Sequence, residues 1–145
     1  MTIRIAVLLS VAGILAVADT AAAQNAGKQR VEGVVESIGY ARAIQVGSTI
    51  YVSGLVGGGE TVEQQQDQIY TQLAALLKPM GATLNDIVKE TAYTTDIEAL
   101  KAAIPARKRA LGAHRPAATW VQIDRLYSPS AKLEVDFIVV AGSGN

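Results

Sequence analysis

The feature that most limits the possible folds is an imbalance between strand-like and helical segments. Six segments have the pattern of strands: residues 31–38, 43–46, 49–53, 88–94, 117–123 and 132–141. Only two segments, residues 61–78 and 97–112, have the pattern of helices. Two helices can cover only one face of such a sheet. The sequence therefore predicts an α+β fold of order β-β-β-α-β-α-β-β with two helices on one face. A symmetric oligomer is the simplest cover for the other face.

The two helices have recognisable start and stop signals. Thr61 and Gln64 have the spacing of a capping box at the start of the first helix. Asp96 is expected to cap the second helix, and Pro105 to kink or restart it. The first helix should bury one apolar stripe, formed by Val62, Ile69, Leu73, Leu76, Leu77 and Met80.

Glycine and apolar runs mark the strands. Gly47 at the first central position of a two-residue turn predicts a β-hairpin, with residues 54–59 as a loop after it. Residues 132–141 are strongly apolar and are expected to form a central strand.

The N-terminus has the pattern of a secretory signal peptide. Arg4 supplies a positive charge, an apolar run extends from Ile5 to Ala18, and small residues end at Ala23. The run is shorter than the ~20 residues that span a bilayer. We expect a signal peptide at residues 1–23, a single domain at 24–145, and a periplasmic or secreted protein that does not bind a membrane after cleavage.

Composition excludes several classes of function. The chain has 13 basic and 13 acidic residues, so nothing indicates a nucleic-acid partner. It has no cysteine, which excludes disulfides and thiol chemistry. His114 is the only histidine, and we interpret it as a surface or helix-end residue. No metal site and no cofactor are predicted.

Two carboxylates on the last strand form the first candidate site. Glu134 and Asp136 alternate with apolar residues, so both project from one face. They are either a solvated face or, on a covered central strand, a site whose carboxylate has a shifted pKa. The residues alone leave both interpretations open.

A basic cluster near the end of the second helix is the second candidate. It consists of Arg107, Lys108, Arg109 and Arg115. Such a cluster is typical of a favourable interaction with the C-terminal end of a helix. The alternative is contact with an anion such as a substrate carboxylate.

Several segments in the expected order resemble the Rid (YjgF/YER057c/UK114) family. The resemblance implies a chorismate-mutase-like fold and a homotrimer with a small-molecule cleft between subunits. In the family's deaminases an arginine holds the substrate carboxylate, and a glutamate positions the water that attacks an imine, releasing ammonia. The resembling segments are residues 38–43, 46–54, 81–89, 93–96, 116–119 and 132–136.

The resemblance assigns roles to particular residues and reveals one loss. Glu134 matches the water-positioning glutamate, Tyr40 the tyrosine of the cleft, and Ser53 the serine after the hairpin. Ala118 stands where the deaminases have their carboxylate-binding arginine. Because alanine cannot form a bidentate ion pair, we expect Arg115 to take part in substrate binding instead.

Arg42 is the other candidate to replace that arginine, because it follows Tyr40 closely in the sequence. Ile104 also departs from the family, whose deaminases usually have asparagine there.

Two functions from different classes follow. The first is hydrolysis of imine or enamine substrates through a water held by Glu134. The second is non-catalytic binding of a small metabolite in the periplasm, which the loss of the arginine favours. A ribonuclease is disfavoured by the balanced charge and the lack of a histidine pair.

Overall fold

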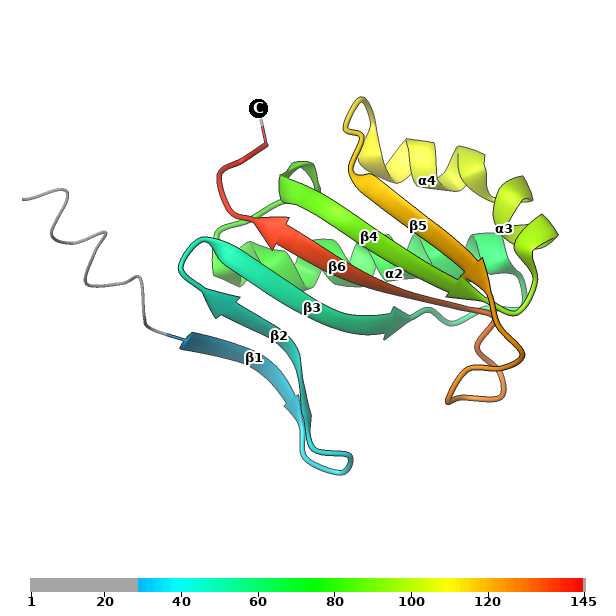
Figure 1. Ribbon diagram of the computed structural model, residues 1–145, viewed down its shortest axis with the longest axis horizontal. Coiled ribbons are helices and arrows are strands. Elements are labelled where there is room, and N and C mark those ends of the chain that lie inside the picture. The colour runs from blue at the N-terminus through cyan, green and yellow to red at the C-terminus, as the bar shows by residue number, and fades with distance from the viewer. Residues whose placement is uncertain (1–28, 145) are drawn as a thin grey trace, which may run out of the picture.

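The computed structural model describes residues 29–144, so the expected signal peptide lies outside the described residues. The described chain forms one six-stranded sheet with helices behind it (Figure 1). The strands are β1 (Gln29–Val35), β2 (Tyr40–Val46), β3 (Thr49–Val56), β4 (Ile87–Thr94), β5 (Ala117–Gln122) and β6 (Leu133–Val140).

The strand order across the sheet is β1-β2-β3-β6-β4-β5. All neighbouring strands are antiparallel except β4 and β5, which are parallel and joined through helices. The apolar last strand, β6, lies between β3 and β4, which confirms its predicted central position. The predicted α+β class and element order are therefore confirmed.

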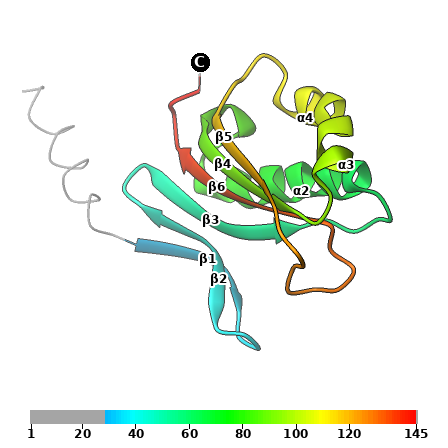
Figure 2. The ribbon, with the colours of Figure 1, turned by 45° about the vertical axis from the view of Figure 1, so that its right-hand side comes forward.

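The helices are α2 (Val62–Leu77), α3 (Ile97–Ala102) and α4 (Ile104–Leu111), and all lie on one face of the sheet (Figure 2). The Thr61–Gln64 capping box is present at the start of α2, and the Asp96 side chain accepts the backbone N–H of Ala99 at the start of α3. The predicted second helix is divided in two because Pro105 occupies the first turn of α4. No helix within residues 29–144 is long and apolar enough to cross a membrane.

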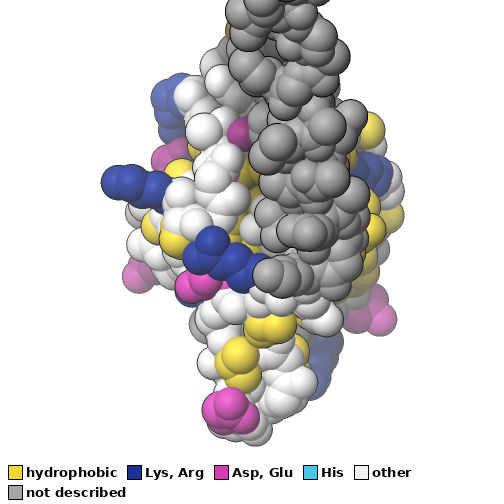
Figure 3. Space-filling model, turned by 90° about the vertical axis from the view of Figure 1, so that its left-hand side faces the viewer, with side chains coloured by type: hydrophobic (Ala, Val, Ile, Leu, Met, Phe, Trp, Pro, Cys, Tyr) yellow, Lys and Arg dark blue, Asp and Glu magenta, His cyan; other side chains and the backbone are white. Residues whose placement is uncertain are grey.

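The core lies between the helices and one face of the sheet. Every second residue of β6, from Leu133 to Val139, is buried there. On the other face several large apolar side chains are exposed, among them Tyr51 (53%) and Val121 (37%). Apolar side chains are also visible on the β1–β2 hairpin, which stands out from the body of the molecule (Figure 3). One face of the sheet is thus left without a cover, as the sequence predicted.

The predicted loop at residues 54–59 begins too early. Leu55 is buried and pairs with Val135, so β3 continues to Val56. The register shifts between Val52 and Leu55, which places an extra residue in β3 as a β-bulge. The bulge interrupts the alternation of buried and more exposed residues along β3.

The buried side chain of Gln65, on α2, hydrogen-bonds both to the loop before α2 and to the segment that leads into β6. Its amide nitrogen donates to the carbonyls of Gly59 (2.9 Å) and Ser130 (3.1 Å). Its amide oxygen accepts the backbone N–H groups of Lys132 (2.8 Å) and Leu133 (3.1 Å). The start of α2 therefore fixes the loop that leads into β6.

Replacing Gln65 by methionine should lower the free energy of unfolding by about 3 kcal/mol, because buried backbone groups lose their partners. Urea denaturation measures the effect. Gln66 offers a matched control: it is also buried, and its amide oxygen has no hydrogen-bond partner within residues 29–144. We expect Gln66→Met to be neutral or stabilising. Equal losses at both positions would contradict this account of Gln65.

Candidate functional site

A cavity of about 370 Å³ opens on the uncovered side of the sheet, where β2, β3 and β6 meet the loop before β6. This size falls within the range of small-molecule sites. Tyr40, Ser53 and Glu134, three residues predicted for the site, are brought together there. The full lining is Ile38, Tyr40, Ser53, Gly54, Val56, Tyr127, Ser128 and Glu134.

The bulge in β3 builds the floor of this cavity. Ser53 and Gly54 are the residues within the register shift, opposite β6. A side-chain carbon added at Gly54 would overlap the Glu134 carboxylate, so only glycine leaves room for that carboxylate. Gly54 thus allows the Glu134 side chain to lie against β3.

The hydroxyl of Ser53 has a defined orientation. Its Oγ donates to the Ala41 carbonyl at 2.7 Å, across β2 and β3. Because a hydroxyl has one proton, Ser53 can only accept hydrogen bonds from a molecule in the cavity. Ser53 is therefore suited to bind an N–H group or a water molecule.

The electrostatics of the cavity favour a protonated Glu134 more than is usual for glutamate. Partial burial raises the pKa of Glu134 above its ordinary value of 4.5, and the charge of Asp136 raises it further. Asp136 accepts a hydrogen bond from the Tyr93 hydroxyl at 3.2 Å. The negative charge of Asp136 raises the pKa of Tyr93, so this phenol stays neutral. Glu134 and Asp136 are both half-buried, which supports a site over a plain solvated face.

The other two predicted binding residues lie elsewhere in the same chain. Ala118 is exposed on the edge strand β5, in register with Glu90 of β4. Glu90 is buried against the helices, so Ala118 faces the helix side of the sheet. Arg115 donates from one nitrogen to the carbonyls of Gly112 and His114, both at 2.7 Å. Neither residue lines the cavity of its own chain. Either residue can therefore take part in substrate binding only at the cavity of a second chain.

Arg42 also points away from the cavity. It donates to the side chain of Gln72 on α2 at 3.0 Å. His114 follows α4 and contacts the Ile87 carbonyl at 2.6 Å, in keeping with the helix-end role expected for it. No cluster of potential metal ligands exists within residues 29–144.

The basic cluster is divided among different tasks. Arg107 forms a buried ion pair with Glu90, with Nε and Oε1 2.6 Å apart. Glu90 also accepts from the Tyr70 hydroxyl (2.9 Å) and the Trp120 indole (3.2 Å). Arg109 pairs on the surface with Glu63 at 3.0 Å. Neither the helix-end interpretation nor the anion-binding interpretation describes Arg107, because its ion pair joins α4 to β4.

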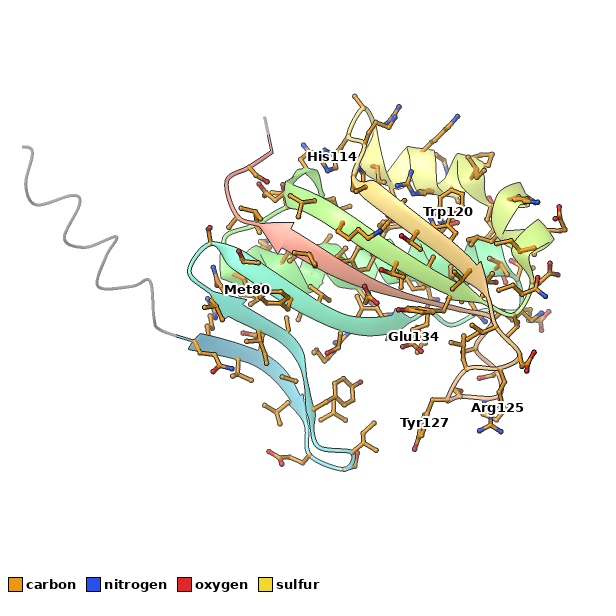
Figure 4. All side chains as sticks on the ribbon, viewed as in Figure 1. Met80, His114, Trp120, Arg125, Tyr127 and Glu134 are labelled. Atoms are coloured by element: carbon orange, nitrogen blue, oxygen red, sulfur yellow. The ribbon has the colours of Figure 1, made fainter. Side chains whose placement is uncertain are left out.

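Tyr127 and Ser128 were missed by the sequence analysis. They belong to the segment between β5 and β6, which has no periodic pattern. Tyr127 is 80% exposed and forms the rim of the cavity (Figure 4). The only signal for them was their position close before Glu134.

Comparison with known proteins places the chain in a family. The sequence model described as endoribonuclease L-PSP matches residues 34–141, almost the whole described region. A solved member of the YjgF/YER057c/UK114 family from Mycobacterium tuberculosis is 25% identical and superposes with a TM-score of 0.73, covering 78% of this chain and 99% of the other. The protein therefore belongs to the Rid (YjgF/YER057c/UK114) family, as the resemblance implied.

Two relatives match much of the same region of the chain. A 2-iminobutanoate/2-iminopropanoate deaminase from Dermatophagoides farinae is 27% identical over 109 residues, covering 70% of this chain and 84% of the relative. A RutC family protein from Pyrococcus abyssi is 32% identical over 95 residues, covering 60% of this chain and 75% of the relative.

Proposed function

We propose that the protein hydrolyses small imines to carbonyl compounds and ammonia in the cavity beside Glu134. The observation that carries this proposal is the joint position of Glu134, Ser53 and Tyr40 around one cavity of about 370 Å³. The chain's similarity to a 2-iminobutanoate/2-iminopropanoate deaminase supports the same chemistry.

The cavity offers a group for each step of such a hydrolysis. The ionised carboxylate of Glu134 accepts a proton from a water as its oxygen bonds to the imine carbon. The C=N double bond becomes a single bond, and its electron pair moves to nitrogen. Glu134 then returns this proton to nitrogen, which gives an amino alcohol. It next accepts the proton of the new hydroxyl group and delivers it to nitrogen, so that the C–N bond breaks and ammonia leaves as the C=O bond forms. The oxygen of Ser53 accepts the N–H of the imine, because its own proton is bound to the Ala41 carbonyl.

The uncovered sheet face supports an oligomer, and the family resemblance makes a homotrimer the expected form. Exposed apolar side chains, including Tyr51 and Val121, would be removed from water between subunits. Sedimentation equilibrium distinguishes a trimer from a monomer.

Non-catalytic binding of a metabolite is the second candidate function, and the observation that favours it is Ala118. A trapping experiment separates the two. An amino-acid oxidase generates the imine, and semicarbazide traps it as a semicarbazone. An imine hydrolase lowers the yield of semicarbazone and raises the rate of ammonia release, whereas a binding protein changes neither when present in catalytic amount.

The activity should fall in acid at a higher pH than for an ordinary glutamate. The working form of Glu134 is the carboxylate, and its pKa is raised, so the active fraction is lost as the pH falls through that raised value. The pH dependence of kcat/KM, corrected for titration of the substrate, measures this. A profile that stays flat below neutral pH would contradict a catalytic carboxylate at this position.

The raised pKa of Glu134 has the opposite effect on the stability of the fold, which it favours in acid. A raised pKa in the folded state means that Glu134 stabilises the fold when protonated, and this contribution is lost as the pH rises through the raised value. Glu134→Gln should therefore be more stable than the native chain at neutral pH, with the difference shrinking in acid.

A further inference from the structure

The charge of the cavity beside Glu134 is negative. Its lining contains one acid, Glu134, and neither lysine nor arginine. Asp136, two residues further along β6, lies on the same face of the sheet and adds a second negative charge close by. A carboxylate placed in this cavity would therefore be repelled, whereas a positive charge would be attracted.

The cations that lie near the lining residues in the sequence are bound elsewhere or lie outside the lining. The ammonium of Lys132 donates to the Glu60 carbonyl at 2.6 Å. The guanidinium of Arg42 donates to the side chain of Gln72 on α2 at 3.0 Å. Arg125 belongs to the segment before β6 and does not line the cavity. Within residues 29–144, none of these three cations offsets the negative charge at the cavity.

The polar groups on the floor of the cavity accept hydrogen bonds. Within residues 29–144 no hydrogen bond holds the Glu134 carboxylate, so both of its oxygens are open to a ligand. The oxygen of Ser53 also accepts, because its own proton is donated to the Ala41 carbonyl. Two such acceptors suit a ligand that carries N–H donors and a positive charge.

Aromatic and apolar side chains form much of the remaining lining. Tyr40 and Tyr127 both line the cavity, with 39% and 80% of their surfaces exposed. Tyr127 lies below Glu134 in the view of Figure 4. The face of an aromatic ring attracts cations, and Ile38 and Val56 add apolar surface for a short carbon chain. The cavity is thus suited to a small organic cation with an apolar end.

The group of an imine that matches this cavity is the protonated C=N bond. A protonated imine carries N–H donors and a positive charge at the bond that water attacks. In a 2-imino acid, a carboxylate is attached to the same carbon, and the lining of the cavity holds no cation to pair with it. An imine derived from a primary amine has no such carboxylate.

We propose that the preferred substrates are protonated imines without a carboxylate, the class that oxidation of a primary amine produces. The proposal rests on the imine hydrolysis proposed above and names its substrate class. Ser53 accepts an N–H of the bound group, and the positive charge lies beside the Glu134 carboxylate. 2-Imino acids are also hydrolysed, with a higher KM, because their carboxylate is held close to two negative charges.

Hydrolysis of the protonated form uses the same groups. Attack by water gives the amino alcohol directly, because nitrogen already has the proton that Glu134 first delivers to a neutral imine. The proton that Glu134 took from water then goes to nitrogen. The C–N bond breaks and ammonia leaves as the hydroxyl proton passes to Glu134 and the C=O bond forms. Glu134 finally releases this proton to solvent.

The binding test uses three stable probes of nearly the same shape: propanamidinium, propanamide and propanoate, which are cationic, neutral and anionic. Titrations followed by nuclear magnetic resonance measure their affinities, including weak ones. We expect the native protein to bind propanamidinium about 10- to 100-fold more tightly than propanamide, because hydrogen bonds to charged groups are stronger, and propanoate most weakly. Glu134→Gln should abolish this preference. Glu63→Gln, which removes the same charge from the exposed side of α2, is the matched control and should keep it.

The kinetic test compares two imines that differ only in the carboxylate. An amine oxidase generates propan-1-imine from propylamine, and an amino-acid oxidase generates 2-iminobutanoate from 2-aminobutanoate. Each kcat/KM is divided by the spontaneous rate of hydrolysis of the same imine. We expect this ratio to be about 10-fold or more larger for propan-1-imine, with most of the difference in KM.

The outcomes separate this inference from the proposed function. Equal affinity for the three probes, or tighter binding of propanoate, would overturn the substrate class, and ammonia release from 2-iminobutanoate would show that the hydrolysis still stands. If neither imine is hydrolysed faster than in the absence of protein, both proposals fail. A preference for propanamidinium that is lost in Glu134→Gln, together with the larger ratio for propan-1-imine, supports the inference.

Discussion

Glu134→Gln should lower kcat/KM for imine hydrolysis by about 10²- to 10⁴-fold, the usual contribution of a general base. Glutamine keeps the size of the side chain above Gly54, and it cannot accept a proton from water. Ammonia release measured at several substrate concentrations gives the effect. Binding of 2-oxobutanoate, the product of 2-iminobutanoate hydrolysis, should be retained, because the substitution removes a negative charge and leaves the cavity open.

Glu98→Gln provides the control for this experiment. Glu98 is an exposed glutamate on α3, in the helical layer on the other face of the sheet, and it pairs with Lys101 on the surface. We expect native activity from this variant. If Glu134→Gln also kept native activity, the water would have to be activated by another group, and the proposed chemistry would be wrong.

Arg107→Ala should lower the free energy of unfolding by about 3–5 kcal/mol, the usual cost of leaving a buried charge without its partner. Arg107 and Glu90 are 12% and 1% exposed, and their closest atoms are 2.6 Å apart. The guanidinium also lies over the Trp120 ring, 5.5 Å from its centre. Denaturant unfolding followed by the fluorescence of Trp120, the only tryptophan, measures the loss directly.

Arg109 supplies the comparison on the same helix. It is exposed and pairs with Glu63 and Asp67 on the surface, where water and salt screen the attraction. Arg109→Ala should therefore cost much less than Arg107→Ala. A double variant, Glu90→Leu with Arg107→Leu, should recover much of the stability, because it leaves neither charge unpaired. No recovery would mean that the geometry of the whole cluster, including Tyr70, matters more than the paired charges.

The fold was largely predictable because its main signals are local. The capping pair Thr61 and Gln64, the cap at Asp96 and the break at Pro105 each depend on a few neighbouring residues. The apolar pattern of β6 predicted its central place for the same reason. The bulge at Ser53 and Gly54 was not predictable in this way, since it depends on pairing with a strand some eighty residues later.

The site was predictable only in part. Glu134, Tyr40 and Ser53 lie on strands whose motifs are recognisable, and the structure brings them to one cavity. Tyr127 lies on a segment whose position depends on the distant amide of Gln65. The buried pair of Glu90 and Arg107 joins a strand to a helix, and no spacing in the sequence reveals such a contact.

Ammonia release from 2-iminobutanoate by the native protein, with Ala118→Arg beside it, tests the central claim most directly. We predict that the native chain releases ammonia well above the spontaneous rate although residue 118 is alanine. We also predict that Ala118→Arg brings little gain, because the new side chain would start beside the buried Glu90. A silent native protein that becomes active with Ala118→Arg would contradict the claim and would identify the native cavity as a site for binding rather than hydrolysis.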